Sequence, residues 1–279
     1  MREHDELTRE LRDVKARLSA IESSRWWRLN PRGALRRLRA DGDHAAAHEP
    51  TRKHSYPVDF GEDDVEICRR VAPYTMTTPP RLYALIQAVE YVVARDVPGA
   101  LVECGVWRGG SMMAAALTLL RRGVTDRDLY LFDTFSGMTA PTDVDRKPSG
   151  ERAADLLETE ERDADVWAIA SLGEVREAVL AVGYPAERIH FVQGAVEETL
   201  PGDAPGEIAL LRLDTDWYES TKHELVHLYP RLARGGVLIL DDYGFWQGAR
   251  RAVDEYFGEQ GEPLLLNRID HTGRIGLKP

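Results

Sequence analysis

The sequence predicts a doubly wound α/β fold with a mostly parallel sheet, and three observations favour it. Short apolar runs alternate along the chain with longer segments in which apolar residues recur at helical spacing. The short runs are continuously apolar, which is typical of strands that helices cover on both faces. Several runs are followed at once by Asp or Gly, and the ends of parallel strands share one edge of a sheet. That edge is where such folds bind their ligands.

The elements follow one another in a regular order after residue 60. Apolar residues at helical spacing predict helices at residues 81–95, 111–122, 172–182, 219–232 and 250–257. Continuous apolar runs predict strands at residues 100–106, 129–132, 188–192, 208–213 and 236–240. The runs 264–269 and 274–277 flank His271-Thr272-Gly273 and are expected to close the sheet as a hairpin. The alternation of strands and helices indicates a Rossmann-like arrangement.

The chain of 279 residues changes character near residue 53. Residues 1–53 contain 13 basic and 9 acidic residues, whereas the whole chain carries a formal net charge of −11. Two segments with different physical properties are therefore expected. We predict a basic helical arm at residues 1–40, a linker at 41–60, and one domain at 61–279 that contains a polar lid at about 136–165.

The arm contains a short heptad pattern. Its apolar residues are spaced alternately four and three apart, as on one face of a coiled-coil helix, at Leu7, Leu11, Val14, Leu18 and Ile21. Trp26 and Trp27 follow among arginines, and Pro31 then interrupts the helix. We interpret the arm as a segment that packs on its own domain or on a partner, and we expect a homo-oligomer. Docking on a membrane surface is the alternative interpretation.

The composition argues against several classes of protein. An acidic chain repels nucleic acid, so no nucleic-acid partner is expected. No run reaches the roughly 18 apolar residues of a membrane span, and the charged N-terminal residues lack the apolar region of a secretory signal. Two cysteines, Cys68 and Cys104, are too few for a disulfide framework and show no metal-ligand spacing. We therefore expect a cytoplasmic protein.

A glycine-rich turn follows the first predicted strand. Gly105, Gly109 and Gly110 permit a ligand to approach the backbone, and the N-terminus of the next helix favours an anionic group. The spacing differs from the GxGxxG of dinucleotide-binding proteins, which argues against a nicotinamide-dependent enzyme. Asp133 ends the next strand, where an acidic residue accepts hydrogen bonds from ribose hydroxyls. The pattern favours a nucleoside-containing cofactor without a pyrophosphate, and a tight turn beside a solvated Asp133 is the alternative.

Acidic residues follow two further strands. Asp214, Asp241 and Asp242 are expected at neighbouring strand ends, where their negative charges repel one another. Such a cluster is held by a cation or shares protons. Carboxylate oxygens without nearby Cys or His select Mg²⁺, Mn²⁺ or Ca²⁺. The alternative for Asp242 is that it caps the next helix.

Six segments in fixed order resemble one family. They are ECGVWRGGS, LFDTFSGM, RIHFVQGAVEETLP, LRLDTDWYEST, LYPRLARGG and LILDDYGFWQGARRAVDEYF. Together with residues 74–77 and Arg81, they resemble the macrocin O-methyltransferase (TylF-type) family over roughly residues 60–275. That family is similar in architecture to class I S-adenosylmethionine-dependent methyltransferases, so the resemblance implies a seven-stranded sheet. It also implies Mg²⁺-dependent transfer of the S-adenosylmethionine methyl group to a hydroxyl of a sugar on a glycosylated natural product or glycan.

The resemblance implies a cofactor site. Residues 103–111 would frame the methionine and ribose of the cofactor, and Asp133 would hold the ribose hydroxyls. Residues 193–194 would lie beside the adenine, and residues 76–77 would close over the cofactor or the acceptor. The individual residues implied are Met76, Thr77, Glu103, Gly105, Trp107, Gly109, Ser111, Asp133, Thr134, Phe135, Ser136, Gln193 and Gly194.

The resemblance also implies that Asp214, Asp241 and Asp242 hold Mg²⁺. We expect Asp214 to be the catalytic residue, a base that touches both the metal and the proton of the acceptor hydroxyl. Trp217 stands three positions after Asp214, where catechol O-methyltransferases place a lysine, so a lysine-driven mechanism is not expected. The acids suit any vicinal diol, and a phenolic or catechol-type acceptor is the alternative to a sugar.

One motif indicates a different chemistry. His223-Glu224-Leu225-Val226-His227 matches HExxH, the zinc-protease signature, on a predicted helix. Both histidines fall on one face of that helix, as zinc binding requires. Pro230 interrupts the helix soon afterwards, and one face of the helix must pack on the sheet. A zinc hydrolase is the distant alternative, and a surface pair of histidines is the preferred interpretation.

Overall fold

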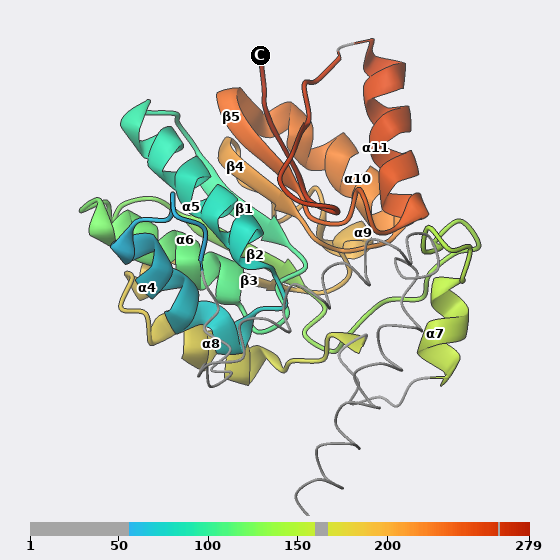
Figure 1. The fold of residues 1–279 in the computed structure, drawn as a ribbon, viewed down its shortest axis with the longest axis horizontal. Helices are drawn as coiled ribbons and strands as arrows, with labels where there is room; N and C mark the ends of the chain where they lie inside the picture. The colour runs from blue at the N-terminus through green and yellow to red at the C-terminus, as the bar shows by residue number, and fades with distance from the viewer. Residues whose placement is uncertain (1–55, 160–166, 262) are drawn as a thin grey trace, which may run out of the picture. The chain divides into compact units, whose positions relative to one another are not determined.

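The described residues form a sheet with helices on both sides. The computed structural model describes residues 56–159, 167–261 and 263–279 (Figure 1). The predicted arm at 1–40 and most of the predicted linker lie outside these residues, so both stay predictions. Within the described ranges, no helix has the length and apolar character needed to cross a membrane.

One mixed sheet of seven strands organises the domain. Its order is β3-β2-β1-β4-β5-β7-β6, so the chain starts near the centre and winds outward in both directions. The strands are β1 (Ala100–Cys104), β2 (Leu129–Asp133), β3 (Ile189–Gln193), β4 (Ile208–Leu213), β5 (Leu232–Leu240), β6 (Asn267–Arg268) and β7 (Arg274–Leu277). β1 to β5 are parallel, whereas β7 runs antiparallel to both of its neighbours. The prediction of a seven-stranded, mostly parallel α/β sheet is confirmed.

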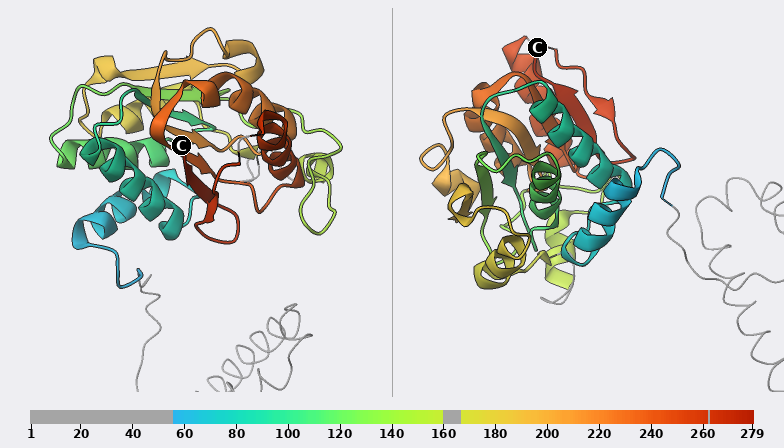
Figure 2. Two further views of the ribbon diagram at one scale, coloured as in Figure 1. Left: turned by 90° about the horizontal axis from the view of Figure 1, so that it is seen from above. Right: turned by 90° about the vertical axis from the view of Figure 1, so that its left-hand side faces the viewer.

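Helices cover both faces of the sheet (Figure 2). One face carries α4 (Glu62–Val71), α5 (Pro79–Ala94), α6 (Gly110–Arg121) and α8 (Leu172–Leu180). The other carries α9 (Val196–Thr199), α10 (Tyr218–Leu228) and α11 (Gln247–Gln260). Short 3-10 turns are η1 (Ala72–Tyr74), η3 (Ala186–Arg188) and η4 (Tyr229–Arg231). β1 and β4 are buried along their whole length, which explains why their sequences are apolar apart from Glu103 and Arg212.

Some boundaries differ from the predictions for physical reasons. The predicted helix at 219–232 ends at Leu228, because Pro230 cannot continue an α-helix and the chain forms η4 instead. β5 consequently begins at Leu232 rather than at residue 236. α4 was not predicted, because the acidic residues in its sequence EDDVEICRRV mask a narrow apolar face.

The predicted lid at about 136–165 is described up to Thr159. It contains α7 (Ala153–Thr159), and its buried Asp145 attaches it to the domain. The carboxylate of Asp145 accepts hydrogen bonds from the backbone N–H of Thr142 (2.7 Å) and from that of Tyr218 (2.8 Å) at the start of α10. A carboxylate is stabilised at a helix N-terminus. The insertion is thus tied to the helix that follows β4, and its role as a lid stays a prediction.

Gly105 lets the loops after β1 and β4 pass close to each other. Its φ is 83°, and a Cβ atom at this position would overlap the carbonyl oxygen of Asp214. The backbone N–H of Asp214 donates to the carbonyl of Cys104 (2.9 Å), and the N–H of Gly105 donates to that of Phe132 (2.9 Å). Backbone contacts therefore fix the spacing of the ends of β1, β2 and β4.

One carboxylate holds the turn of the closing hairpin. Asp270 accepts hydrogen bonds from the backbone N–H groups of Thr272 (2.9 Å) and Gly273 (2.8 Å). It also accepts one from the hydroxyl of Thr78 (2.9 Å), and its Oδ2 lies 3.2 Å from Nε of Arg81 on α5. Burial opposes ionisation, but the hydrogen bonds and Arg81 together lower the pKa of Asp270 to about 2. The hairpin therefore depends on an ionised Asp270.

We predict that Asp270→Asn reduces the loss of stability in acid. A carboxyl whose folded pKa is about 2 stabilises the fold fully above its unfolded pKa near 3.8, and this contribution disappears as the pH falls toward 2. The difference in unfolding free energy is about 2 kcal/mol. Urea unfolding between about pH 6 and about pH 2 measures it, with exposed Asp203→Asn as the control. Equal pH slopes for wild type and Asp270→Asn would contradict this account.

Candidate active site

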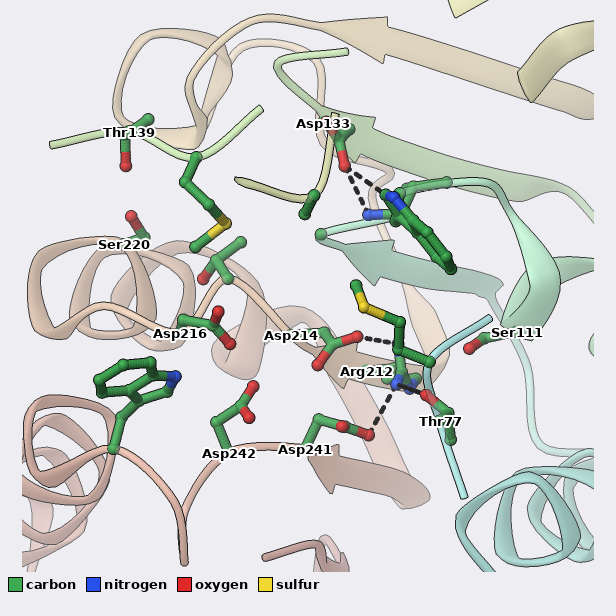
Figure 3. Close-up of a pocket in the computed structure, with 18 of the residues that line it drawn as sticks. Thr77, Ser111, Asp133, Thr139, Arg212, Asp214, Asp216, Ser220, Asp241 and Asp242 are labelled. Carbon is green, nitrogen blue, oxygen red and sulfur yellow. Dashed lines mark hydrogen bonds and ion pairs between the residues drawn. The ribbon is translucent and has the colours of Figure 1, made fainter. Parts of the chain in front are cut away.

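A cavity of about 650 Å³ opens at the carboxyl ends of β1, β2, β4 and β5. Its size is typical of sites for cofactors and small molecules. Figure 3 shows Asp133 on one side of this cavity and four aspartates, residues 214, 216, 241 and 242, on another. Ligands of doubly wound sheets bind at this edge.

Asp133 organises the loops on its side of the cavity. Its Oδ2 accepts hydrogen bonds from the backbone N–H groups of Val106 (2.7 Å) and Trp107 (3.0 Å) in the loop after β1. Its Oδ1 accepts one from the N–H of Phe135 (2.7 Å) in its own loop. Trp107 and Phe135 both have positive φ, 48° and 51°, a conformation that such side chains rarely adopt. The carboxylate therefore stabilises two strained turns next to the cavity.

Arg212 joins the acids from three strands. It lies on β4 with 3% of its side chain exposed. Its Nη1 is 2.6 Å from Oε1 of Glu103 on β1 and 2.8 Å from Oδ2 of Asp214. Its Nη2 donates to Oδ1 of Asp241 (2.6 Å) and to the hydroxyl of Thr77 (3.0 Å). Figure 3 shows this guanidinium between Asp214, Asp241 and Thr77.

The buried charges of this group are partly balanced. Burial raises the pKa of Glu103 to about 7, although Arg212 acts in the opposite direction. Asp241 also pairs with Arg81 of α5, so two guanidinium groups hold its two oxygens. Burial raises the pKa of Asp214 well above its ordinary value, and Arg212 opposes that shift. Charge-assisted hydrogen bonds of this kind are required to keep such acids inside a protein.

Three of the carboxylates form a cluster suited to a cation. Oxygens of Asp214, Asp216 and Asp242 lie within 4.8 Å of one another. Burial raises the pKa of Asp216 to about 7 and that of Asp242 well above its ordinary value. A divalent cation would relieve the repulsion among these acids. Asp241, which the sequence placed among the metal ligands, is not part of this cluster and pairs with Arg212 and Arg81, and its role as a ligand stays a prediction.

Aromatic and small polar residues form the remaining wall. Phe245 and Trp246 line the cavity with perpendicular rings whose centroids are 5.0 Å apart. Thr139 and Ser220 also line the cavity, and Figure 3 shows both in the same part of the view as Asp216. Trp217 is buried, and its indole N–H donates to the carbonyl of Thr139 at 3.1 Å. Trp217, which stands where catechol O-methyltransferases place a lysine, therefore supports the wall of the cavity.

Most of the residues implied by the resemblance meet at this cavity. Those that line it are Met76, Thr77, Gly105, Trp107, Ser111, Asp133, Thr134, Gly194, Asp214, Asp241 and Asp242. The others lie behind it or beside it. Glu103 is buried against Arg212, Phe135 belongs to the hydrophobic core, and Gly109 caps α6. Ser136 and Gln193 are exposed.

The HExxH segment does not form a metal site among the described residues. The rings of His223 and His227 are 4.3 Å apart between centroids, and both side chains are partly exposed. Glu224 is fully buried and accepts a hydrogen bond from Thr215 at 2.9 Å. Within the described ranges, the group of three or more ligands close enough to hold a metal consists of aspartates rather than histidines.

Comparison with known proteins identifies the family. The sequence model of the macrocin-O-methyltransferase (TylF) family matches residues 22–275. The chain belongs to the macrocin O-methyltransferase family. It is therefore an S-adenosylmethionine-dependent O-methyltransferase, and its fold is that of the class I enzymes. The residues that carry the resemblance in the sequence fall within the matched range.

Curated relatives and a solved structure agree with this assignment. One relative, the 8-demethyl-8-(2,3-dimethoxy-alpha-L-rhamnosyl)-tetracenomycin-C 4'-O-methyltransferase of Streptomyces olivaceus, is 38% identical over 200 residues, 72% of this chain and 74% of that protein. The demethyldecarbamoylnovobiocin O-methyltransferase of Streptomyces niveus is 37% identical over the same shares of the two chains. The solved structure of the O-methyltransferase NovP has a TM-score of 0.64 at 35% identity, covering 74% of this chain and 82% of that chain.

Several residues of the cavity have no role that could be assigned from the sequence. They include Arg81, Arg212, Asp216, Thr139 and Ser220. Arg212 has a signal in the sequence, because it is the charged residue of a strand, IALLRL, that is otherwise apolar and buried throughout. A buried arginine requires acidic partners. Thr139 and Ser220 are common polar residues whose position only the fold reveals.

We predict that Arg212→Met lowers the free energy of unfolding by about 3–5 kcal/mol, because Glu103, Asp214 and Asp241 then lack their shared cation. Urea unfolding at neutral pH measures the change. Arg188→Met is the matched control: Arg188 pairs with Asp128 but is 42% exposed, so its loss should cost about 0–1 kcal/mol. Equal stability of Arg212→Met and wild type would show that the acids do not depend on this guanidinium.

Proposed function

We propose that the protein transfers the methyl group of S-adenosylmethionine to a hydroxyl of a sugar on a glycosylated natural product or glycan, with Mg²⁺ as the metal. The observation that carries the proposal is that the loops after β1 and β2 and the aspartates after β4 and β5 open into the same cavity. Two relatives support the choice of acceptor. They are named as the 4'-O-methyltransferase of a rhamnosyl-tetracenomycin and as a demethyldecarbamoylnovobiocin O-methyltransferase.

The cofactor is proposed to bind on the side of Asp133. A carboxylate has about four lone-pair sites, and backbone N–H groups use three of those of Asp133. The hydroxyl of Thr134 lies 3.5 Å from Oδ1 of Asp133 but has one hydrogen, which it donates to the carbonyl of Gly137 at 2.7 Å, so a site remains for a ribose hydroxyl. Gly105 and Gly194 allow a ligand to approach the backbone on either side of this residue. Met76 is 50% exposed at the cavity and is placed to cover the cofactor from solvent.

The aspartate cluster fits Mg²⁺. Oδ2 of Asp242 is buried and has no hydrogen-bond partner in the part of the chain that the structure describes. Such an oxygen needs a cation or a donor. When bound, Mg²⁺ would lower the pKa of the acceptor hydroxyl and align two oxygens of a vicinal diol. Asp214 and Asp242 are the proposed ligands, and either Asp216 from the observed cluster or Asp241 from the sequence prediction supplies the third carboxylate.

Asp214 is the proposed catalytic base. Arg212 fixes its Oδ2 at 2.8 Å, and the side chain faces the cavity next to the acid cluster. A general base must lie within hydrogen-bond reach of the proton that it accepts, and Asp214 is placed to reach the hydroxyl of an acceptor bound beside it in the cavity. The methyl group transfers in line from the cofactor sulfur to the acceptor oxygen, and the proton of the hydroxyl passes to Asp214. Holding acceptor and cofactor at reacting distance supplies much of the rate enhancement.

A phenolic acceptor is the second candidate. Phe245 and Trp246 offer aromatic surfaces at the cavity, and these can stack on a phenol or on a sugar ring. The two candidates differ in the acceptor that supports methyl transfer, so one activity panel of glycosides and catechols separates them.

We predict that S-adenosylhomocysteine binds the EDTA-treated protein at a stoichiometry of one, measured by titration calorimetry. Asp133→Ala should weaken this binding by roughly tenfold or more, because the ribose and the two turns lose their carboxylate. Asp128→Ala, at the opposite end of β2, is the control.

Asp214→Asn should keep cofactor binding, and its rate of methyl transfer to a glycoside should fall at least roughly 100-fold. Absence of binding by wild type, or full activity of Asp214→Asn, would contradict the proposal.

We predict that the wild-type protein binds Mn²⁺, used as a spectroscopic substitute for Mg²⁺. The Asp242→Asn variant should bind Mn²⁺ roughly 10–100-fold more weakly. Electron paramagnetic resonance of free Mn²⁺ measures the dissociation constant. Asp216→Asn and Asp241→Asn then identify the third ligand, since only the variant of the true ligand should show a comparable loss. Wild-type affinity in Asp214→Asn and Asp242→Asn would place the metal elsewhere.

A further inference from the structure

The loop that carries Asp214 and Asp216 contains a strained turn. Asp216 has a φ of 69°, which non-glycine residues rarely adopt. The backbone N–H of Trp217 donates to the carbonyl of Thr215 at 2.8 Å, so the chain reverses within three residues, as in a γ-turn. Strained turns persist only where surrounding contacts hold them. Thr215 lies between the two acids, so a contact that anchors it restrains the loop that carries both carboxylates.

Glu224 is that anchor. It lies on α10 with 0% of its surface exposed, and its Oε1 accepts a hydrogen bond from the hydroxyl of Thr215 at 2.9 Å. Its Oε2 has no hydrogen-bond partner among the described residues. Burial raises the pKa of Glu224 well above its ordinary value. A buried carboxyl with one unused oxygen costs stability, whereas a leucine at this position would pack against the sheet as Leu225 and Leu228 do.

The contact joins two elements at one defined point. α10 follows the loop directly, and it is held at its first turn by Asp145. The hydroxyl of Thr215 lies on the residue between the two acids, so its bond to Glu224 restrains the backbone from which both side chains leave. Asp214 is held in addition by Arg212 and by the carbonyl of Cys104, so Asp216 depends more on this restraint. Residues behind a metal ligand commonly orient it in this way, and losing one costs 10–100-fold in metal affinity.

We propose that Glu224 is a positioning residue for the metal-binding carboxylates, acting through Thr215. This inference rests on the proposed Mg²⁺ site. It also gives a function to the glutamate of the HExxH segment, whose histidines take no part: the glutamate points to the aspartate loop, where it orients ligands rather than activating water.

The test compares Mn²⁺ affinity with thermal stability in full-length protein. Thr215→Val/Glu224→Leu replaces both polar partners with apolar groups of similar size, which is nearly neutral for stability. We expect this double variant to melt within a few degrees of wild type and to bind Mn²⁺ roughly 10–100-fold more weakly. Thr215→Val alone should lose affinity to a similar extent and guards against misfolding of the double variant. Glu224→Gln and Thr215→Ser keep the hydrogen bond, so each single variant should retain most of the wild-type affinity for Mn²⁺.

Leu228→Ala is the matched control for packing. Leu228 is buried on the same helix, and its truncation should lower the melting temperature without changing the dissociation constant of Mn²⁺. If wild type binds Mn²⁺, and folded Thr215→Val and the double variant bind it with unchanged affinity, then Glu224 does not position the ligands. The proposed metal site would be unaffected by that result. No Mn²⁺ binding by wild type overturns the metal site and this role with it. Equal loss of affinity in Leu228→Ala reduces Glu224 to a packing residue.

Discussion

The buried guanidinium of Arg212 is the interaction on which the candidate active site depends. Parallel strands bring Glu103, Asp214 and Asp241 to one edge of the sheet, and acids at such short distances repel one another. Arg212 pairs with all three and also binds Thr77, which belongs to the segment before α5. One cation therefore joins β1, the loops after β4 and β5, and the segment before α5. These ion pairs also depend on the exclusion of water from the guanidinium of Arg212, which is buried.

Backbone geometry supplies the second constraint. Gly105 permits the loops after β1 and β4 to touch, and Asp133 holds the turns after β1 and β2. These contacts place the glycine-rich loop next to the aspartates. In the proposed function the methyl donor and the hydroxyl acceptor bind at these two loops, which would bring them together, and positioning of this kind is a large part of what a methyltransferase has to provide.

The fold could be predicted because its signals are local. Apolar runs and helical spacing predicted the strands and the main helices, but the end of α10 was predicted four residues too late although Pro230 lies within the predicted range. The candidate site was predictable where residues follow strand ends, as Asp133 and Asp214 do. Pairings between distant side chains were not. The engagement of Asp241 by Arg212 and Arg81, and the contact of Glu224 with Thr215, depend on register and helix rotation, which no local pattern encodes. α4 was not predicted, because its many charged residues make its narrow apolar face difficult to recognise in the sequence.

The most direct test of the account is a crystal structure of the protein soaked with Mn²⁺ and S-adenosylhomocysteine, with anomalous diffraction to locate the metal. The account predicts an anomalous peak between the carboxylates of Asp214 and Asp242, a ribose on Asp133, and Arg212 still paired with Glu103 and Asp241. A metal peak at the histidines of α10, or a nucleoside bound outside the cavity, would contradict it.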